Sequence, residues 1–193
     1  MDSVGVLELF RQSEALLEGH FELSSGLHSA GYLQCARVLQ YPERSQKLGQ
    51  ALAAKAAGLE PTVVLSPALG GVVLGHEVAR ALGVRALFAE RRDERLLLRR
   101  GFQIVSDERV LIVEDVVTTG LSTRETIGVA TAAGGNVIGA TALIDRGEAP
   151  AEFALPFEVL VRFPLPTHRP EACPMCVCGE PVIKPGSRQE AIG

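Results

Sequence analysis

The chain has no long apolar run. It contains no stretch of roughly 18 consecutive apolar residues, the length that a membrane-spanning helix needs. Its amino terminus also lacks the basic segment, apolar segment and cleavage site that together mark a secretory signal. We therefore expect no membrane span and no secretion, and we expect the protein to be cytoplasmic.

Basic charge is not in excess, and cysteine is scarce. The 19 Lys and Arg residues face 23 Asp and Glu residues, so the net charge is −4 and we expect no nucleic-acid partner. Cys35 stands alone, and the other three cysteines, Cys173, Cys176 and Cys178, lie near the end of the chain. This distribution does not fit a disulfide scaffold in a chain of 193 residues.

What the chain does have is enough apolar residues for a sizeable core. With 47% apolar content in 193 residues, we expect one domain over residues 1–193. Strand and helix patterns alternate, which indicates an α/β fold with a mostly parallel central sheet flanked by helices. Helices are expected at Val4–Glu18, Pro42–Ala57, Gly71–Leu82 and Thr123–Ala133. Strands are expected at Val63–Ser66, Arg85–Ala89, Arg109–Val113 and Val137–Ile144, with short extended pieces between Phe21 and Leu39.

The most informative segment follows the apolar strand that ends at Val113. It comprises Glu114, Asp115, Val116, Val117, Thr118, Thr119, Gly120, Leu121 and Ser122. Ser122 with Glu125 three residues later predicts a capping box at the start of a helix, where unpaired amides and the helix dipole favour a phosphate. The two carboxylates suit hydrogen bonds from a ribose diol and, through Mg²⁺ and water, balance a diphosphate. The segment therefore predicts a site for a phosphorylated sugar.

This segment resembles the phosphoribosyl diphosphate signature of type I phosphoribosyltransferases. The resemblance implies the fold of that family and a site in which residues 114–122 bind phosphoribosyl diphosphate, with Glu114 and Asp115 acting in catalysis. It also implies Mg²⁺ as cofactor, held mainly by substrate and water and not by protein ligands. The alternative interpretation is an acidic pair that forms an unrelated metal site or a plain helix N-cap.

A second loop, residues 66–71, also lies between an expected strand and an expected helix. Its sequence is Ser-Pro-Ala-Leu-Gly-Gly, and glycines there let backbone amides approach an anion. Taken alone, it is most often an ordinary turn. In the resembled family this position holds the diphosphate loop, with an unusual non-proline peptide that would fall between Ala68 and Leu69.

Residues 90–100 carry five arginines. From composition alone we favour a solvated hairpin or an ion-paired edge. The resemblance instead implies a basic lid that closes over the diphosphate and reaches into the neighbouring subunit of a homodimer. Arg91, Arg92 and Arg95 match the basic positions of that lid, although the histidine common in it is missing.

Two segments bear on which base is transferred. Phe21 to Tyr32 resembles the amino-terminal hood of orotate phosphoribosyltransferases, with Ser24 where some members have a lysine. We expect a small hood formed by residues 1–40 together with the tail, residues 165–193. The resemblance also implies that Arg146 binds orotate with help from Thr118, because a guanidinium suits a carboxylate beside ring oxygens. The alternative is that Asp145 and Arg146 form an ion pair in an ordinary loop.

The cysteines of the tail raise the possibility of a zinc site. Cys173 and Cys176 are spaced as zinc ligands, and Cys178 and His168 are near them in the sequence. A second pair of cysteines is missing and Cys176 and Cys178 are tightly spaced, so we interpret the tail as a structural or interface element and predict no metal held by protein ligands.

Taken together, these resemblances imply an orotate phosphoribosyltransferase that acts in pyrimidine synthesis. It would transfer the 5-phosphoribosyl group to orotate, giving orotidine 5′-monophosphate and diphosphate. Two alternatives stay open: a phosphoribosyltransferase for a purine or uracil, and a non-catalytic regulator that binds phosphoribosyl diphosphate without consuming it.

Overall fold

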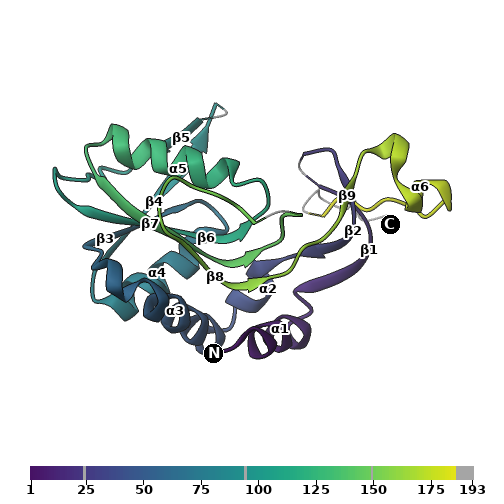
Figure 1. The fold of residues 1–193 in the computed structure, drawn as a ribbon, viewed down its shortest axis with the longest axis horizontal. Helices are drawn as coiled ribbons and strands as arrows, with labels where there is room; N and C mark the ends of the chain where they lie inside the picture. Colours follow the sequence, from purple (N-terminus) through teal and green to yellow (C-terminus); the bar gives the residue numbers. More distant parts are fainter. Residues whose placement is uncertain (24, 94, 149, 186–193) are drawn as a thin grey trace, which may run out of the picture.

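The chain folds around a six-stranded sheet of order β5-β4-β3-β6-β7-β8 (Figure 1). The computed structural model describes residues 1–23, 25–93, 95–148 and 150–185. The strands are β3 (Val63–Pro67), β4 (Arg85–Arg92), β5 (Arg95–Leu98), β6 (Arg109–Val117), β7 (Asn136–Asp145) and β8 (Phe157–Arg162). All neighbouring pairs are parallel except β4 and β5. The α/β fold with a mostly parallel sheet is therefore confirmed.

Helices cover both faces of this sheet because its central strands are apolar on both sides. On β6, Leu111 and Val113 belong to one core cluster, whereas Val110 and Ile112 belong to the other. The helices α1 (Ser3–Gln12), α2 (Cys35–Leu39), α3 (Pro42–Ala56) and α4 (Gly71–Leu82) pack on the first cluster. The helix α5 (Leu121–Ala132) packs on the second, above the sheet in Figure 1. Among the described residues, no helix combines the length and apolar character needed to cross a bilayer.

A second, three-stranded antiparallel sheet stands at one end of the molecule (Figure 1). We call it the hood sheet; it contains β1 (Leu16–Glu22), β2 (His28–Leu33) and β9 (Thr167–His168). The tail continues from β9 through the short helices η2 (Pro170–Ala172) and α6 (Pro174–Val177). It then returns to β1, where Ile183 bridges to Phe21. The hood sheet is thus built from one segment early in the chain and another late in it.

The prediction of a helix over Val4–Glu18 is wrong beyond Gln12. The Ser13 hydroxyl donates to the Leu9 carbonyl, and Glu14 has a positive φ of 50°, which ends the helical path. The residues that follow pair with β2 instead. This strand pairing with a distant segment overrides the local helical pattern. The helix expected over Pro42–Ala57 is present as α3 up to Ala56. A tighter 3₁₀ turn, η1 (Ala57–Leu59), follows it directly.

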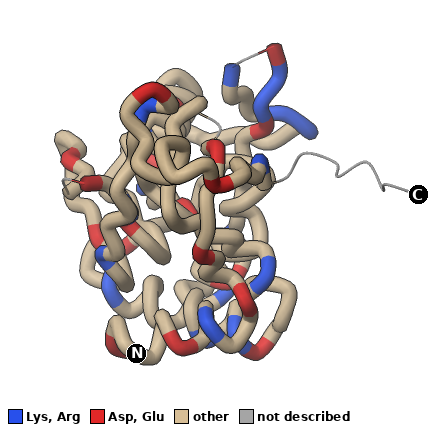
Figure 2. The backbone as a smooth tube through the Cα atoms, turned by 90° about the vertical axis from the view of Figure 1, so that its right-hand side faces the viewer, with Lys and Arg blue, Asp and Glu red and all other residues tan. Residues whose placement is uncertain are grey.

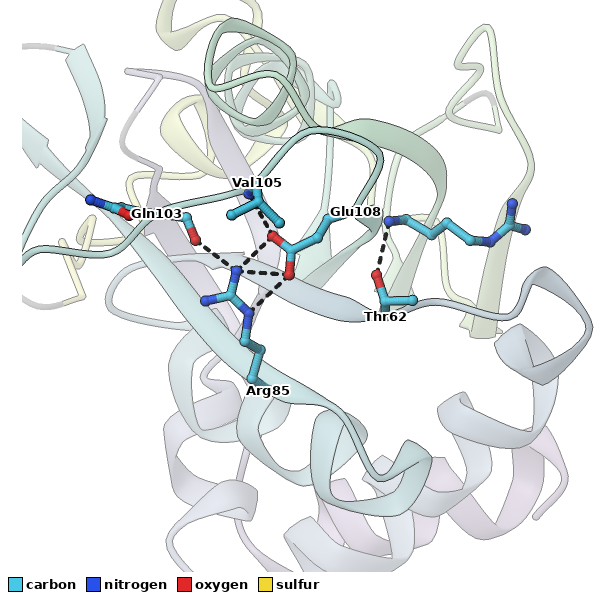
Figure 3. A network of polar contacts seen from close by, with 6 residues as sticks. Thr62, Arg85, Gln103, Val105 and Glu108 are labelled. Carbon is cyan, nitrogen blue, oxygen red and sulfur yellow. Dashed lines mark hydrogen bonds and ion pairs between the residues drawn. The ribbon is translucent and has the colours of Figure 1, made fainter.

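A polar network fixes the connection between β5 and β6 (Figure 3). Arg85 of β4 binds both carboxylate oxygens of Glu108, at 2.8 and 2.6 Å from Nη2, and also donates to the Gln103 carbonyl. Glu108 in turn accepts from the Val105 amide at 2.8 Å. This contact set anchors the start of β6, which carries the acidic pair at its other end.

Candidate active site

Three parallel strands have their carboxyl ends on the same side of the sheet. Each strand leads into a segment that was singled out in the sequence. Strand β3 ends at Pro67, β6 at Val117 and β7 at Asp145. Val117 and Asp145 are register partners, and the Arg146 amide donates to the Val117 carbonyl at 2.8 Å. Thr118 and Arg146 therefore leave the sheet side by side. Ligands bind at such carboxyl ends in parallel sheets.

Glu114 and Asp115 extend β6 and, as consecutive strand residues, face opposite sides of the sheet. Glu114 accepts a hydrogen bond from Ser122 and is 5% exposed. Burial raises the pKa of Glu114 to about 8, and the neighbouring Asp115 charge adds to the increase. Burial also raises the pKa of Asp115, against a hydrogen bond from the Val116 amide at 2.9 Å. Burial therefore disfavours the ionised form of both carboxyl groups. A cation or a hydroxyl donor bound to them would favour the ionised form again.

The loop of residues 66–71 contacts Asp115 directly. A methyl group built at Gly70 would lie 2.5 Å from Asp115 Oδ2, so a larger residue there would push the Asp115 carboxylate out of its position. The peptide bond between Ala68 and Leu69 is cis, and the Leu69 side chain is 86% exposed. Helix α4 starts at Gly71, immediately after this loop. The loop that the resemblance assigns to diphosphate therefore lies beside the acidic pair.

The phosphate loop follows β6, but its cap differs from the prediction. Helix α5 begins at Leu121 with Gly120 as N-cap in the left-handed conformation, φ 75°. The predicted capping box of Ser122 and Glu125 is wrong, because Ser122 already lies inside the helix and its hydroxyl turns to Glu114. Thr118 and Thr119 are exposed. The loop still presents exposed hydroxyls and the first amides of a helix, which is the chemistry that binds phosphate.

Arg146 is buried beneath the hood sheet with few partners of its own. Its side chain is 5% exposed, its Nη2 donates to Ser29 Oγ at 3.3 Å, and its Nε has no hydrogen-bond partner. Burial lowers the pKa of Arg146, which is opposed by Tyr32. Within the described part of the chain no carboxylate pairs with this guanidinium. A buried cation of this kind favours an anionic ligand.

The alternative ion pair between Asp145 and Arg146 does not form. Asp145 instead pairs with Arg162 at 3.6 Å and accepts from the amides of Gly147 and Ala151. Sequence reasoning assigned no role to Ser29 and Tyr32, the two hood residues that interact with Arg146. Both residues lie within Phe21 to Tyr32, the pattern that resembles the hood of orotate phosphoribosyltransferases. Ser24 of that pattern lies outside the described residues.

The arginine-rich segment forms an antiparallel hairpin of β4 and β5. Arg91 forms an ion pair with Glu125 of α5, and Arg92 forms one with Asp93 at 3.6 Å. Arg95 begins β5 and is exposed, while Glu94 lies outside the described residues. Figure 2 shows the basic positions gathered along this hairpin with acidic positions among them. The hairpin interpretation of the segment is confirmed, and its action as a lid stays a prediction.

The tail places two of its cysteines next to two histidines of the hood sheet. Cys173 and Cys176 lie against His20 and His28. The sequence had suggested Cys178 and His168 as their companions, and the structure groups neither with them. None of the four cysteines, all of which lie in the described residues, forms a disulfide.

Comparison with known proteins identifies the family. A family model described as "Phosphoribosyl transferase domain" matches residues 37–154. The chain is 50% identical over 189 residues to the orotate phosphoribosyltransferase of Caldanaerobacter subterraneus subsp. tengcongensis, covering 98% of this chain and 100% of that protein. The chain belongs to the orotate phosphoribosyltransferase family. Another member, from Heliobacterium modesticaldum, is 52% identical over 95% of this chain and 97% of its own length.

Solved structures share the fold of this orotate phosphoribosyltransferase family member. The Mycobacterium tuberculosis orotate phosphoribosyltransferase, solved with inorganic phosphate, superposes with a TM-score of 0.66. The match has 24% identity and covers 82% of this chain and 94% of that one. The sequence prediction of a type I phosphoribosyltransferase fold is confirmed.

Proposed function

We propose that this chain transfers the 5-phosphoribosyl group from phosphoribosyl diphosphate to N1 of orotate, giving orotidine 5′-monophosphate and diphosphate for pyrimidine synthesis. The observation that carries the choice of base is Arg146. Orotate is a planar anion, and a guanidinium binds a carboxylate and a neighbouring ring oxygen through paired, charge-assisted hydrogen bonds. The unpartnered Nε of a buried Arg146, next to Thr118, supports this assignment.

The other residues of the site would bind the 5-phosphate and the ribose of the substrate. We assign the 5-phosphate to the loop from Thr118 to Ser122, because a helix amino terminus and hydroxyls converge there. The ribose hydroxyls would donate to Glu114 and Asp115. Bond cleavage builds positive charge on the sugar, which the pair stabilises electrostatically. No protein nucleophile is required, since orotate attacks the sugar directly.

Mg²⁺ fits this donor set as an ion held largely by the substrate. The two carboxylates face opposite sides of β6, and within the described residues they belong to no cluster of three or more potential ligands. When bound, the ion neutralises diphosphate charge. Ala68 and Leu69 would then place backbone groups against the diphosphate, which the close approach at Gly70 supports.

We further propose that Arg91, Arg92 and Arg95 contact diphosphate when the β4–β5 hairpin closes, across the interface of a homodimer. The ion pair of Arg91 with Glu125 links the hairpin to α5, whose amino end forms the phosphate site. An exposed arginine hairpin supplies cationic charge where a leaving diphosphate needs it.

A continuous ultraviolet assay of orotate consumption tests this function. Purified protein is mixed with phosphoribosyl diphosphate and Mg²⁺, and parallel reactions offer adenine, hypoxanthine and uracil. We expect consumption of orotate alone, and only with the metal. Turnover of another base would overturn the assignment of the base. Binding of phosphoribosyl diphosphate without turnover would make the chain a sensor.

Asp115→Asn tests the acidic pair. The change removes a negative charge from the side of the sugar while keeping shape, so we expect turnover to fall by about 10²-fold or more. Circular dichroism and the unfolding midpoint should stay near those of the natural chain. Full activity in this variant would remove Asp115 from the mechanism.

A further inference from the structure

Four potential metal ligands converge where the tail meets the hood sheet. They are His20, His28, Cys173 and Cys176, and their ligand atoms all lie within 4.8 Å of one another. His20 comes from β1 and His28 from β2, whereas both cysteines come from the tail more than 140 residues later. Only the folded chain brings these four together. None of them takes part in the phosphoribosyl transfer described above.

Three of the distances within the cluster match a tetrahedral site. Cys173 Sγ lies 3.6 Å from His20 Nε2, and Cys176 Sγ lies 3.7 Å from His20 Nε2 and 3.3 Å from His28 Nδ1. In a tetrahedron with zinc bonds of about 2.0 to 2.3 Å, ligand atoms are separated by about 3.3 to 3.8 Å. The two histidine nitrogens are closer, at 2.8 Å, and would have to separate by about 0.5 Å.

The types of ligand select the metal. Two thiolates and two imidazoles are a common donor set for structural zinc, whereas Mg²⁺ and Ca²⁺ prefer oxygen. All four positions are filled by protein, which leaves no open position for substrate or water. Such a closed site is structural and not catalytic.

The surroundings of the cluster already orient one of the ligands. His20 Nδ1 lies 2.8 Å from the Glu180 carbonyl, a contact that places the proton on Nδ1 and leaves Nε2 facing the cluster. His20, His28 and Cys173 are 3%, 7% and 0% exposed, and Cys176 is exposed. With three buried ligands and one exposed ligand, an ion can enter from solvent while most of its ligands stay shielded from water.

We propose that His20, His28, Cys173 and Cys176 bind one structural zinc ion that fastens the carboxyl-terminal tail to the hood sheet. Ser29 follows His28 directly and accepts a hydrogen bond from Arg146, the proposed orotate ligand. The ion would therefore also stabilise the position of Ser29 beside Arg146. This zinc is separate from the Mg²⁺ of the reaction, and its presence does not depend on the proposed base.

The test compares Cys176→Ser with Cys178→Ser. Both cysteines are exposed and belong to the same tail, but only Cys176 lies in the cluster. The variants and the natural chain are purified without chelator, and zinc is measured by elemental analysis. We expect one zinc per chain in the natural protein and in Cys178→Ser, and loss of most of it in Cys176→Ser. His28→Asn should lose zinc as well.

Two further readouts keep the proposal open to refutation if a variant folds poorly. Natural protein reconstituted with Co²⁺ should show the visible bands and thiolate charge-transfer band of tetrahedral coordination. A chelator should lower the unfolding temperature of the natural chain and of Cys178→Ser, and leave Cys176→Ser unchanged. Equal zinc in the two cysteine variants, no zinc in the natural chain, or a Cys173–Cys176 disulfide found by mass spectrometry would overturn the proposal.

Discussion

At the scale of single residues, the site depends on charges kept in unusual surroundings. Glu114 is a buried carboxyl whose pKa is raised to about 8, and Arg146 is a buried guanidinium with an unpartnered Nε. Each would be costly in a protein that bound nothing there. Bound substrate would reduce the free-energy cost of burying each group. The ribose hydroxyls would donate to the Glu114 carboxylate, and the orotate anion would pair with Arg146.

Glu114 makes stability depend on pH in a defined direction. The unfolded chain ionises this carboxyl near the ordinary value of 4.5, but the folded chain does so only near 8. Between these values the folded state binds more protons, so stability falls as pH rises. Glu114→Gln should flatten this decline in denaturant unfolding curves measured from pH 5 to pH 8.5. The exposed Asp107→Asn is the control and should keep the slope of the natural chain.

Arg146→Ala should weaken orotate binding by about 2 to 5 kcal/mol, because it removes the partner of a buried charged ligand group. The KM for orotate should rise much more than the KM for phosphoribosyl diphosphate. Arg146→Lys keeps the charge but loses the planar fork, so it should recover only part of the loss. Arg37→Lys, at an exposed pair with Glu14, serves as control. Equal changes in both KM values would count against Arg146 as the orotate ligand.

At the scale of elements, the strands that lead to the site are held at the end of the sheet opposite to it. Strand β6 is fixed at its start by the contacts of Glu108 and delivers the acidic pair at its finish. The hairpin β4–β5 starts from the same network through Arg85. These contacts lie far from the site, and Arg92 and Arg95 of the hairpin stay exposed.

Glu108→Gln should lower stability by about 1 kcal/mol at pH 7, since it weakens a charged hydrogen bond that also orders a loop amide. The Arg85 contact lowers the pKa of Glu108. Its contribution is thus present above the ordinary pKa and is lost as pH falls through the lowered folded value. Glu77→Gln removes a similar pair within one helix and should cost less. A loss that does not shrink in acid would show that Glu108 acts by packing alone.

At the scale of the whole molecule, the hood sheet joins a segment early in the chain to one late in it, and the strands of the six-stranded sheet come from the sequence between these segments. Strand β9 pairs with β2, and Ile183 bridges to Phe21. Arg146 connects the layers through Ser29. This hydrogen bond links the hood sheet to the candidate site, and the proposed zinc ion would stabilise the hood side of that contact.

Mixing two inactive variants tests whether the hairpin acts across a dimer. Asp115→Asn lacks the sugar carboxylate, and the double variant Arg92→Ala with Arg95→Ala lacks hairpin cations. If the hairpin serves the partner's site, random exchange of subunits should restore roughly a quarter of natural activity, because half the dimers gain one complete site. Size-exclusion chromatography reports the assembly. No recovery in a confirmed dimer would assign the hairpin to its own subunit's site.

The sequence by itself determined the features that are local. The apolar run before Glu114, the helix Gly71–Leu82 and the loop at Ala68 and Leu69 follow from patterns within about ten residues, and the structure confirms each of these elements. The family also followed from contiguous motifs. Cytoplasmic location stays a prediction.

Only the tertiary structure decided what depends on distant partners. Leu16–Glu22 became a strand because β2 was available to pair with it. Arg146 donates to Ser29 of the hood sheet, and Asp145 pairs with Arg162 of β8. His20 and His28 lie against Cys173 because β9, which precedes the cysteines, pairs with β2. No local spacing records such contacts, since their free energy arises from burial and pairing between segments that only folding brings together.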